Sequence, residues 1–333
     1  MAYDPNIVRR ASARLEENRR AREEQLEALR RQVYAREPRL ARLDRQMRGT
    51  MAELAAAALR RGDRAAEVIR AIRAKNLDIQ QERAVLLGGM GLPEDALDDK
   101  PACPLCGDTG WQGAQMCSCL KQLCAQEQIR ELSKLLDLGE QSFDHFRLDY
   151  YSDTVYPGQA TSPRDNMDLV YEVCLNYAQK FGHFQFKNLF LTGAPGLGKT
   201  FLSACIARSV SEQGFSVVYD TAANIFAQFE NRKFQRDAEG VQSARDETRR
   251  YLNCDLLILD DLGSELTTQF IQSALYELVN TRLMGDRRMV ISSNLTMTEV
   301  GKRYSPAIAS RLMGEFYVLN FFGDDIRLRK QKK

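Results

Sequence analysis

A glycine-rich loop with one lysine and one threonine offers the clearest chemistry in this sequence. The loop, Gly193-Ala-Pro-Gly-Leu-Gly-Lys-Thr200, follows the apolar run 188–192 and precedes a helical pattern of apolar residues. In such a loop, consecutive backbone N–H groups converge on the α- and β-phosphates of a nucleotide at the positive end of a helix. We expect Lys199 to reach the β- and γ-phosphates and the Thr200 hydroxyl to ligate Mg²⁺. The sequence therefore predicts a site for ATP or GTP, formed by Gly193, Ala194, Pro195, Gly196, Leu197, Gly198, Lys199, Thr200 and Phe201.

Two adjacent aspartates, Asp260 and Asp261, close the apolar run Leu256-Leu-Ile-Leu259. A carboxylate at the tip of a buried strand beside the glycine-rich loop can hold Mg²⁺ through a water molecule, and we expect Asp260 to do so. Asp261 would project toward the γ-phosphate, where it could orient and polarise the attacking water. The alternative is an ordinary turn at the end of a strand.

The next apolar run ends in Ser292-Ser-Asn294 and brings an amide to the same edge of the expected sheet. Asn294 should lie between the strand of the glycine-rich loop and the strand of Asp260. From there, its amide can hold the hydrolytic water or an oxygen of the γ-phosphate. The alternative is an asparagine that caps the following helix.

Two arginines near the C-terminus are further candidates for phosphate contact. Arg311, in Ala309-Ser-Arg-Leu312, should emerge on the flank of the domain, where it could act on the γ-phosphate of a neighbouring copy in a ring or filament. Arg303 competes with it for this role. Arg327, in Gly323-Asp-Asp-Ile-Arg327, could contact the γ-phosphate of its own site, or form a solvent-exposed salt bridge instead.

Four closely spaced cysteines predict a structural metal site. Tetrahedral Zn²⁺ needs soft ligands brought together by tight turns, and glycines between the two cysteine pairs supply such turns. With two histidines in the whole chain, an all-cysteine ligand set is strongly favoured. Cys124 is a substitute ligand, and an iron–sulfur cluster or redox-active thiols are alternatives. The expected zinc ligands are Cys103, Cys106, Cys117 and Cys119.

Alternating apolar runs and helical patterns must position the nucleotide-binding residues. Near-continuous apolar strands joined by helical crossovers indicate a parallel sheet covered on both faces, with the ligand at the carboxyl ends of the strands. The expected strands are 188–192, 216–220, 256–260, 289–293 and 316–321.

The amino-terminal half has a helical pattern from about residue 8 to residue 87, with breaks expected at Pro38 and at Arg61-Gly-Asp63. It predicts a helical hairpin or short coiled coil, which could be either a docking arm or a self-contained bundle. Further helices are expected at 120–138 and 167–181. We therefore expect a helical arm over 1–100, a cysteine module over 101–124, a linker over 125–165 and an ATPase domain over 166–333.

Composition narrows the class of protein. A chain of 333 residues with a net charge of +2 suggests two domains and argues against a general polyanion binder. No run of eighteen apolar residues and no apolar signal core occurs, so we expect a cytoplasmic protein that does not contact membranes. Its eight cysteines should then be thiols or metal ligands.

The motifs GAPGLGKT, LLILDDLG, SSN, SRL and GDDIR, in this order, resemble the AAA+ ATPases of the bacterial replicative helicase-loader family, DnaC and DnaI. The cysteine pattern, from Cys103-Pro-Leu-Cys106 to Cys117-Ser-Cys-Leu-Lys121, looks like the zinc-bearing, helicase-contacting domain of DnaI-type loaders. The resemblance covers residues from about 30 to 330.

This resemblance implies an AAA+ fold with a doubly wound, five-stranded parallel sheet, preceded by a helical, zinc-binding domain. It also implies an ATPase that uses Mg²⁺, self-associates through its ATPase domain and delivers the hexameric replicative helicase onto single-stranded DNA. The amino-terminal half would grip the helicase. Asp261 replaces the glutamate usual in AAA+ proteins, which implies slow hydrolysis that DNA or a partner stimulates. Candidate DNA contacts are Arg232, Lys233 and Arg236.

Three other functions compete with the loader. A transposition-helper ATPase of the IstB type shares the nucleotide-binding half but has no reason to have a zinc module. A nucleotide-switched adaptor would need ATP binding without hydrolysis. A small-molecule kinase would need a lid and an acceptor-binding segment, which the sequence does not offer.

Overall fold

The computed structural model describes residues 3–58, 63–135, 141–234 and 238–330. They form two compact units, and each is described here by itself. The sheet unit combines residues 1–12 with 118–333, and the arm unit comprises residues 13–117. Among the helices of the described residues, none combines the length and the apolar character that a membrane span requires.

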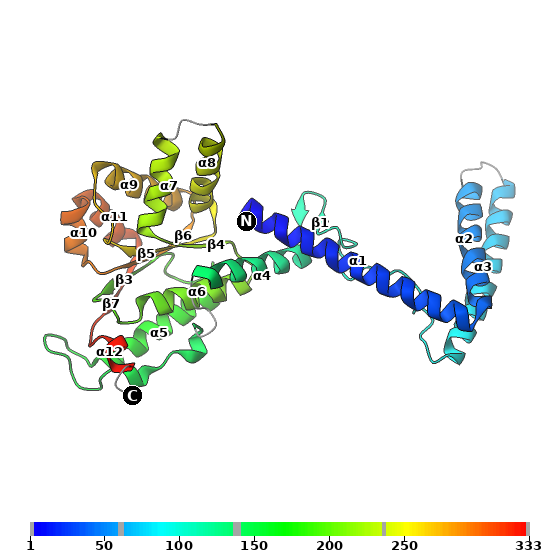
Figure 1. Ribbon diagram of the computed structural model, residues 1–333, viewed down its shortest axis with the longest axis horizontal. Helices are drawn as coiled ribbons and strands as arrows, with labels where there is room; N and C mark the ends of the chain where they lie inside the picture. The colour runs from blue at the N-terminus through cyan, green and yellow to red at the C-terminus, as the bar shows by residue number, and fades with distance from the viewer. Residues whose placement is uncertain (1–2, 59–62, 136–140, 235–237, 331–333) are drawn as a thin grey trace. The chain divides into compact units, whose positions relative to one another are not determined.

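The sheet unit contains a five-stranded, fully parallel sheet with the strand order β4-β5-β6-β3-β7 (Figure 1). This arrangement confirms the predicted fold class and the position of the strand of Asn294, β6, between β5 and β3. The central strands are buried on both faces because helices cover each side, which explains their near-continuous apolar sequences. The strands are β3 (Leu189–Gly193), β4 (Val217–Thr221), β5 (Leu256–Leu262), β6 (Arg288–Ser293) and β7 (Tyr317–Phe321).

Helices form a layer on each face of this sheet, and each layer encloses its own apolar core. Figure 1 shows α5 and α6 on one face and α7 to α11 on the other. Local sequence signals fix several starts: Ser162, Thr268, Thr296 and Ser305 each accept a hydrogen bond from a backbone N–H of the first helical turn. The helices are α5 (Pro163–Gln179), α6 (Lys199–Glu212), α7 (Ala222–Phe234), α8 (Ala238–Asn253), α9 (Gln269–Met284), α10 (Met297–Arg303), α11 (Pro306–Glu315) and α12 (Ile326–Lys330).

The edge strand β4 is covered by α4 (Ser118–Leu135) and by the first turns of α1 (Pro5–Arg36). The Gln128 amide of α4 donates to Ser211 Oγ (2.7 Å) and to the Phe215 carbonyl (3.0 Å). Its oxygen accepts the backbone N–H of Val217 at 2.9 Å. At the start of α1, Ile7 is buried. One side chain thus satisfies the first backbone N–H of the edge strand β4 and a carbonyl two residues before it.

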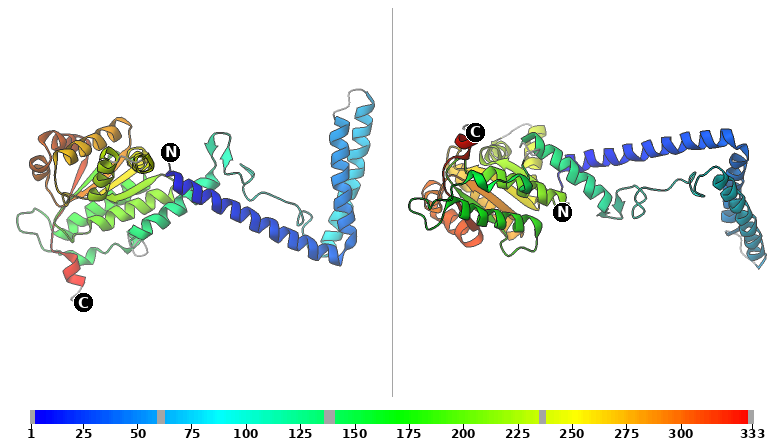
Figure 2. Two further views of the ribbon diagram at one scale, coloured as in Figure 1. Left: turned by 45° about the horizontal axis from the view of Figure 1, so that its top comes forward. Right: turned by 90° about the horizontal axis from the view of Figure 1, so that it is seen from below.

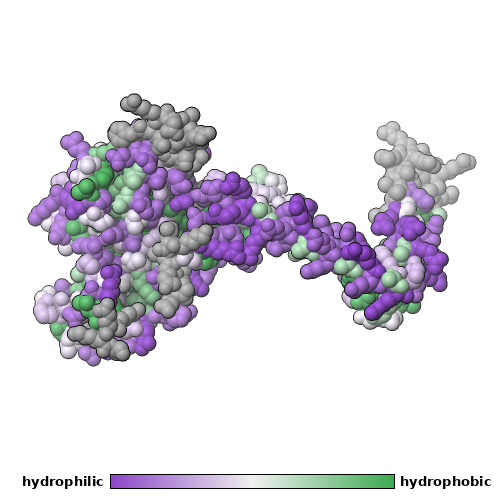
Figure 3. All heavy atoms as spheres, viewed as in Figure 1, coloured by the Kyte–Doolittle hydropathy of each residue, from purple (hydrophilic) through white to green (hydrophobic). Residues whose placement is uncertain are grey.

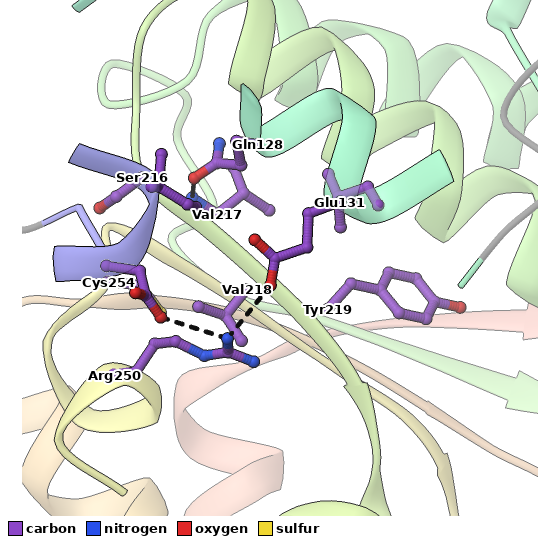
Figure 4. Close-up of a pocket in the computed structure, with 11 residues that line it drawn as sticks. Gln128, Glu131, Ser216, Val217, Val218, Tyr219, Arg250 and Cys254 are labelled. Carbon is purple, nitrogen blue, oxygen red and sulfur yellow. Dashed lines mark hydrogen bonds and ion pairs between the residues drawn. The ribbon is translucent and has the colours of Figure 1, made fainter. Parts of the chain in front are cut away.

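Arg250 of α8 fastens these segments together through ion pairs (Figure 4). Its Nη1 atom lies 3.2 Å from Asp4 Oδ2 and 3.5 Å from Glu131 Oε1, beside a cavity of about 30 Å³. Tyr219 also lines this cavity, and Figure 4 shows its ring further along β4, pointing away from Arg250. The charged network therefore holds the first residues of the chain and α4 against β4 and α8.

The arm unit contains the rest of α1, followed by α2 (Pro38–Ala58) and α3 (Asp63–Gly89). Helices α2 and α3 run antiparallel side by side, as the two views in Figure 2 show. The expected break at Pro38 is confirmed, whereas residues 59–62, with most of the second expected break, lie outside the described residues. Figure 3 shows mainly hydrophilic side chains along α1. The predicted helical hairpin is therefore present.

The core of the arm unit is small and is completed by a buried ion-pair network. Its fully buried apolar members are Leu40, Leu87, Leu97 and Val33. Beside them, the Arg83 guanidinium donates to Asp44 and Asp98, each at 2.7 Å, and to the carbonyl of Glu94. A two-stranded sheet, β1 (Trp111–Gln112) with β2 (Gln115–Met116), completes the unit.

Candidate functional site

The glycine-rich loop joins β3 to α6 in the way that the sequence predicts. Strand β3 ends at Gly193, and Gly198, with φ of 95°, stands just before the first residue of α6. At Gly196, with φ of 78°, a side chain would overlap the carboxylate of Asp325. The positive φ, which residues with a Cβ atom rarely adopt, makes the tight turn depend on glycine.

Lys199 is held inside this loop by three acceptors. Its Nζ atom donates to the carbonyls of Gly193 (2.6 Å) and Ala194 (2.8 Å) and to Asn294 Oδ1 (2.8 Å). Burial lowers the pKa of Lys199 to about 8, although the charges of Asp261 and Asp260 oppose this shift. The ammonium group is therefore already positioned where a triphosphate would neutralise the cost of its burial.

Asp260 accepts hydrogen bonds on both oxygens. Tyr219 donates to Oδ2 at 2.6 Å and Thr200 donates to the same oxygen at 3.2 Å, while Ser292 donates to Oδ1. Asp260 is 6% exposed, so these hydroxyls, and not bulk water, solvate its carboxylate. The juxtaposition of Thr200 with Asp260 agrees with the predicted magnesium site.

The donor set fits Mg²⁺. This ion prefers oxygen ligands, retains several waters and is held in proteins by one or two carboxylates together with phosphates of the substrate. Thr200 and Asp260 supply one hydroxyl and one carboxylate at the end of the glycine-rich loop. The pair leaves the remaining coordination positions to water and nucleotide oxygens.

Asp261 and Asn294 meet at the carboxyl edge of the sheet. The Asn294 amide donates to Asp261 Oδ1 at 2.9 Å and its oxygen accepts from Lys199, so it bridges the lysine to the second aspartate. Asp261 has φ of 56°, a left-handed conformation that is uncommon for a residue other than glycine. Its backbone N–H donates to Ser292 Oγ at 3.0 Å, which fixes this conformation. Strained backbone of this kind concentrates at functional sites.

A cavity of about 580 Å³ opens beside these groups, a size typical of small-molecule sites. Its walls include a segment that the sequence assigned to a linker. Tyr151 of this segment donates to the Leu197 carbonyl at 3.0 Å, and the Phe146 ring lies 5.9 Å from the Phe201 ring. The cavity residues that sequence reasoning missed are Gln141, His145, Phe146, Arg147, Tyr150, Tyr151, Thr221 and Ile326. The aromatic residues between 143 and 151 were the signal that could have found this wall.

The C-terminal segment lies against the glycine-rich loop. The backbone N–H of Ile326 donates to the Gly196 carbonyl at 3.0 Å, and that of Arg327 donates to Asp325 Oδ1 at 2.8 Å. Arg327 is exposed and lines the cavity. Its predicted contact with the γ-phosphate of its own site is therefore compatible with its position.

The two candidate arginine fingers differ in their surroundings. Arg303 donates from Nε to Thr267 Oγ1 (2.9 Å) and from Nη2 to the Glu265 carbonyl (2.6 Å), so it holds the loop that follows β5. Arg311, on α11, is exposed. Between the two, Arg311 is the more exposed.

The weaker candidates for DNA contact lie near the end of α7. Arg232 Nη2 is 3.8 Å from Glu277 Oε1, and Lys233 Nζ is 5.0 Å from the centre of the Phe270 ring. Arg236 lies outside the described residues.

The four predicted zinc ligands converge. The sulfur atoms of Cys103, Cys106, Cys117 and Cys119 all lie within 4.8 Å of one another. Four thiolates at this spacing fit a tetrahedral structural zinc site. Cys124, the substitute ligand, is not in this group; it is fully buried, and burial raises its pKa to about 11.

Asp108 organises the turn between the two cysteine pairs. It has φ of 61° and accepts the backbone N–H groups of Cys103 (2.7 Å) and Ala102 (3.0 Å). Arg22 of α1 donates to the same carboxylate. Burial, which acts to raise its pKa, is outweighed by these hydrogen bonds, so the pKa of Asp108 lies below its usual value. The cysteine turn is thereby tied to α1 within the arm unit.

Comparison with known proteins finds a family match for the part of the chain that contains the glycine-rich loop. The family described as "IstB-like ATP binding protein" matches residues 181–333, somewhat less than half of the chain. The DnaA chromosomal replication initiator of Campylobacter jejuni (strain 81-176) is 25% identical over 132 residues, which are 39% of this chain and 28% of that protein. The putative ATP-binding protein of insertion sequence IS1162 from Pseudomonas fluorescens is 30% identical over 108 residues, 32% of this chain and 44% of that protein. The chain thus spans less than half the length of these relatives.

Among solved structures, the crystal structure of the DnaC helicase loader matches with a TM-score of 0.43 and 16% identity. The match covers 56% of this chain and 99% of that one. The family match includes the glycine-rich loop, both aspartates, Asn294 and both arginine candidates. Residues 181–333 are therefore similar to the IstB-like ATP-binding proteins.

Proposed function

We propose that this protein is an ATP-hydrolysing loader that delivers a replicative DNA helicase onto single-stranded DNA. The ATP-binding domain alone would fit many ATPases. The observation that carries the proposal is the cluster of four cysteine sulfurs within 4.8 Å, which lies outside the family match of 181–333 and follows a helical hairpin along the chain. Its resemblance to the zinc-bearing domain of DnaI-type loaders favours a partner-binding module in the amino-terminal half.

ATP hydrolysis is assigned to the cluster around Lys199. The lysine and the backbone N–H groups of the loop bind and orient the β- and γ-phosphates. Thr200 and Asp260 would hold Mg²⁺, which neutralises developing charge on the phosphates. Asp261 orients the attacking water and accepts its proton, and the Asn294 amide, 2.9 Å from Asp261 Oδ1, holds that carboxylate in place.

Slow turnover follows from the presence of an aspartate at position 261. Asp261 has a side chain one methylene shorter than glutamate, so it holds the water further from the phosphorus. Arg311 of a neighbouring copy would complete the site, because an added guanidinium stabilises the transition-state charge. Assembly on the helicase or DNA would then raise the rate by bringing Arg311 of one copy to the nucleotide of the next.

The proposal is tested with purified full-length protein, a hexameric replicative helicase and circular single-stranded DNA coated with single-strand binding protein. We expect ATP-dependent assembly of helicase on the circles, measured as unwinding of an annealed strand. Cys103→Ser/Cys106→Ser should abolish helicase binding and retain ATP binding. Arg311→Ala should retain ATP affinity and lose DNA-stimulated turnover.

Three results would contradict the proposal. Absence of helicase binding would exclude the loader. Loading that survives Lys199→Ala unchanged would leave an adaptor that does not need ATP. Turnover unchanged in Arg311→Ala would refute the assignment of that arginine to the site of a neighbour.

A transposition-helper ATPase is the second candidate. It is favoured by the IstB-like family match and by the relative from an insertion sequence. A transposase that binds the full-length protein in the presence of ATP, with no binding to the helicase, would select this function over the loader.

A further inference from the structure

The carboxylate of Asp260 is bonded to a residue that does not line the nucleotide cavity. Tyr219 lies on β4, the strand next to Asp260, and its hydroxyl donates to Asp260 Oδ2 at 2.6 Å. This distance is shorter than the 3.2 Å between the same oxygen and Thr200 Oγ1. Tyr219 is absent from the walls of the 580 Å³ cavity and lines the small cavity beside Arg250 instead. It therefore acts on Asp260 from behind, away from the nucleotide.

The environment of Tyr219 keeps its hydroxyl a donor. Its side chain belongs to the apolar core between the sheet and α6, and the residue is 5% exposed. These apolar surroundings leave Asp260 Oδ2 as the acceptor of the phenol proton.

Packing of the Tyr219 ring fixes the direction of its hydrogen bond to Asp260. The tyrosine ring is fixed between β4 and α6, whereas Asp260 alone can rotate about its terminal torsion. With Ser292 on Oδ1 and Tyr219 on Oδ2, both ends of the carboxylate are fixed. The lone pair that remains on Oδ2 faces the hydroxyl of Thr200, the other expected magnesium ligand.

We propose that Tyr219 is a positioning residue for the magnesium ion of this site, holding Asp260 in the orientation that binds the ion together with Thr200. The inference rests on the proposed function, since it assumes that the site binds ATP with Mg²⁺. Partners outside the ligand shell commonly change metal affinity by about 10- to 100-fold when they are removed. The hydroxyl of Tyr219 has that relation to Asp260.

Tyr219→Phe removes the hydroxyl and keeps the ring in the core. Tyr251→Phe is the matched control: the Tyr251 hydroxyl donates to Asp220 Oδ2 at 2.8 Å, so this variant also removes a buried tyrosine–aspartate bond at β4 without touching Asp260. For each protein, binding of a fluorescent ATP analogue is measured in EDTA and across a series of Mg²⁺ concentrations. Thermal unfolding without nucleotide reports folding.

We expect Tyr219→Phe to need about tenfold more Mg²⁺ for half of the Mg²⁺-dependent gain in nucleotide affinity. Its affinity in EDTA should equal that of the wild type, as should both quantities in Tyr251→Phe. An unchanged Mg²⁺ requirement would overturn the inference, and so would an equal loss of affinity in EDTA and in Mg²⁺. If the wild type itself bound nucleotide no better with Mg²⁺ than in EDTA, the proposed magnesium site would fail, which is a distinct outcome.

Discussion

The nucleotide site and the cysteine cluster differ in whether their ligand-binding groups have partners within the protein. Around Lys199, each charged group already has partners within the protein: carbonyls and an amide for the ammonium, and hydroxyls for Asp260. In the cysteine cluster, four sulfur atoms face one another, and four thiolates in this arrangement repel unless a cation lies between them.

The apolar cores that support the two sites also differ, in their size. The site of Lys199 rests on two large apolar clusters that fill both faces of the sheet. Among the described residues of the arm unit, the apolar cluster around Leu87 is much smaller, and the sheet consists of two short strands. A large core can hold an empty site in shape, whereas a small one commonly needs a metal. The sheet unit should therefore keep its fold without nucleotide, whereas loss of the metal should unfold the cysteine module.

The largest expected effect is that of removing the metal ligands. In Cys103→Ser/Cys106→Ser, the cysteine module should lose its order, because structural zinc contributes on the order of 10 kcal/mol to the folding of such modules. Trp111, the single tryptophan of the chain, lies in β1 and reports the change by its emission, together with hydrogen exchange over 101–119. ATP binding should stay within about twofold of the wild type. Cys205→Ala, a buried cysteine outside the cluster, is the control; wild-type emission in the double variant would contradict the comparison.

A matched pair of core substitutions tests whether the two units are stabilised separately. Leu257 on β5 and Leu40 on α2 are both fully buried, and replacement of such a leucine by alanine costs about 2–5 kcal/mol. Leu257→Ala should lower the unfolding temperature of the part that binds ATP, and Leu40→Ala should lower that of the arm unit. Calorimetry with and without ATP distinguishes the two, since ATP stabilises only what binds it. A single transition that shifts equally in both variants would show one cooperative unit.

Loss of the loop lysine should weaken nucleotide binding strongly and leave the metal module intact. Lys199→Ala is expected to weaken ATP binding on the order of 100-fold, because hydrogen bonds to charged groups contribute about 1.5–3 kcal/mol each. Lys187→Ala is the control, since Lys187 is exposed and pairs with Asp286 at 2.6 Å. Equilibrium titration with labelled ATP measures both. Equal affinity in the two variants would sink the assignment of the site.

A smaller effect is expected from pH. The pKa of Lys199 is about 8 without nucleotide, and bound phosphates must raise it because they favour the charged form. Above pH 8, ATP binding therefore takes up a proton on Lys199. ATP affinity should then fall by at most about tenfold for each further pH unit, until the pH exceeds the pKa of Lys199 in the complex. Calorimetric titration in buffers of different ionisation enthalpy counts the proton. Flat affinity from pH 7 to pH 10 would contradict this linkage.

Most of the sheet unit was predictable because its signals are local. Apolar runs of strand length and a complete glycine-rich loop fixed the positions of β3, β5 and β6, and the parallel topology then brought Asp260, Asn294 and Lys199 together. The cysteine cluster was predictable for the same reason, since ligand spacing is read directly from the chain. In both cases the relevant contacts follow from short segments and one topological rule.

The parts that escaped prediction depend on contacts between distant segments. The sequence around Tyr151 does not predict that its hydroxyl donates to the Leu197 carbonyl. The sequence around Tyr219 likewise does not predict Asp260 as the acceptor of its hydroxyl. The burial of Ile7 against the sheet unit was equally invisible, because the first residues continue a charged helical pattern. Such contacts are set by the packing of whole elements, which periodicity does not encode.

The hydrogen bond between Gln128 of α4 and the first residue of β4 has a practical consequence for studies of the ATP-binding domain alone. A fragment beginning at residue 141 would retain the whole sheet and the glycine-rich loop but would lose α4 and the first turns of α1. The backbone N–H of Val217 would lose its acceptor, and the uncovered edge of β4 would become a template for a strand from another molecule. Such a fragment should aggregate or form non-native dimers. Self-association measured on it would then report contacts through the exposed edge of β4 and not the association of the full-length protein.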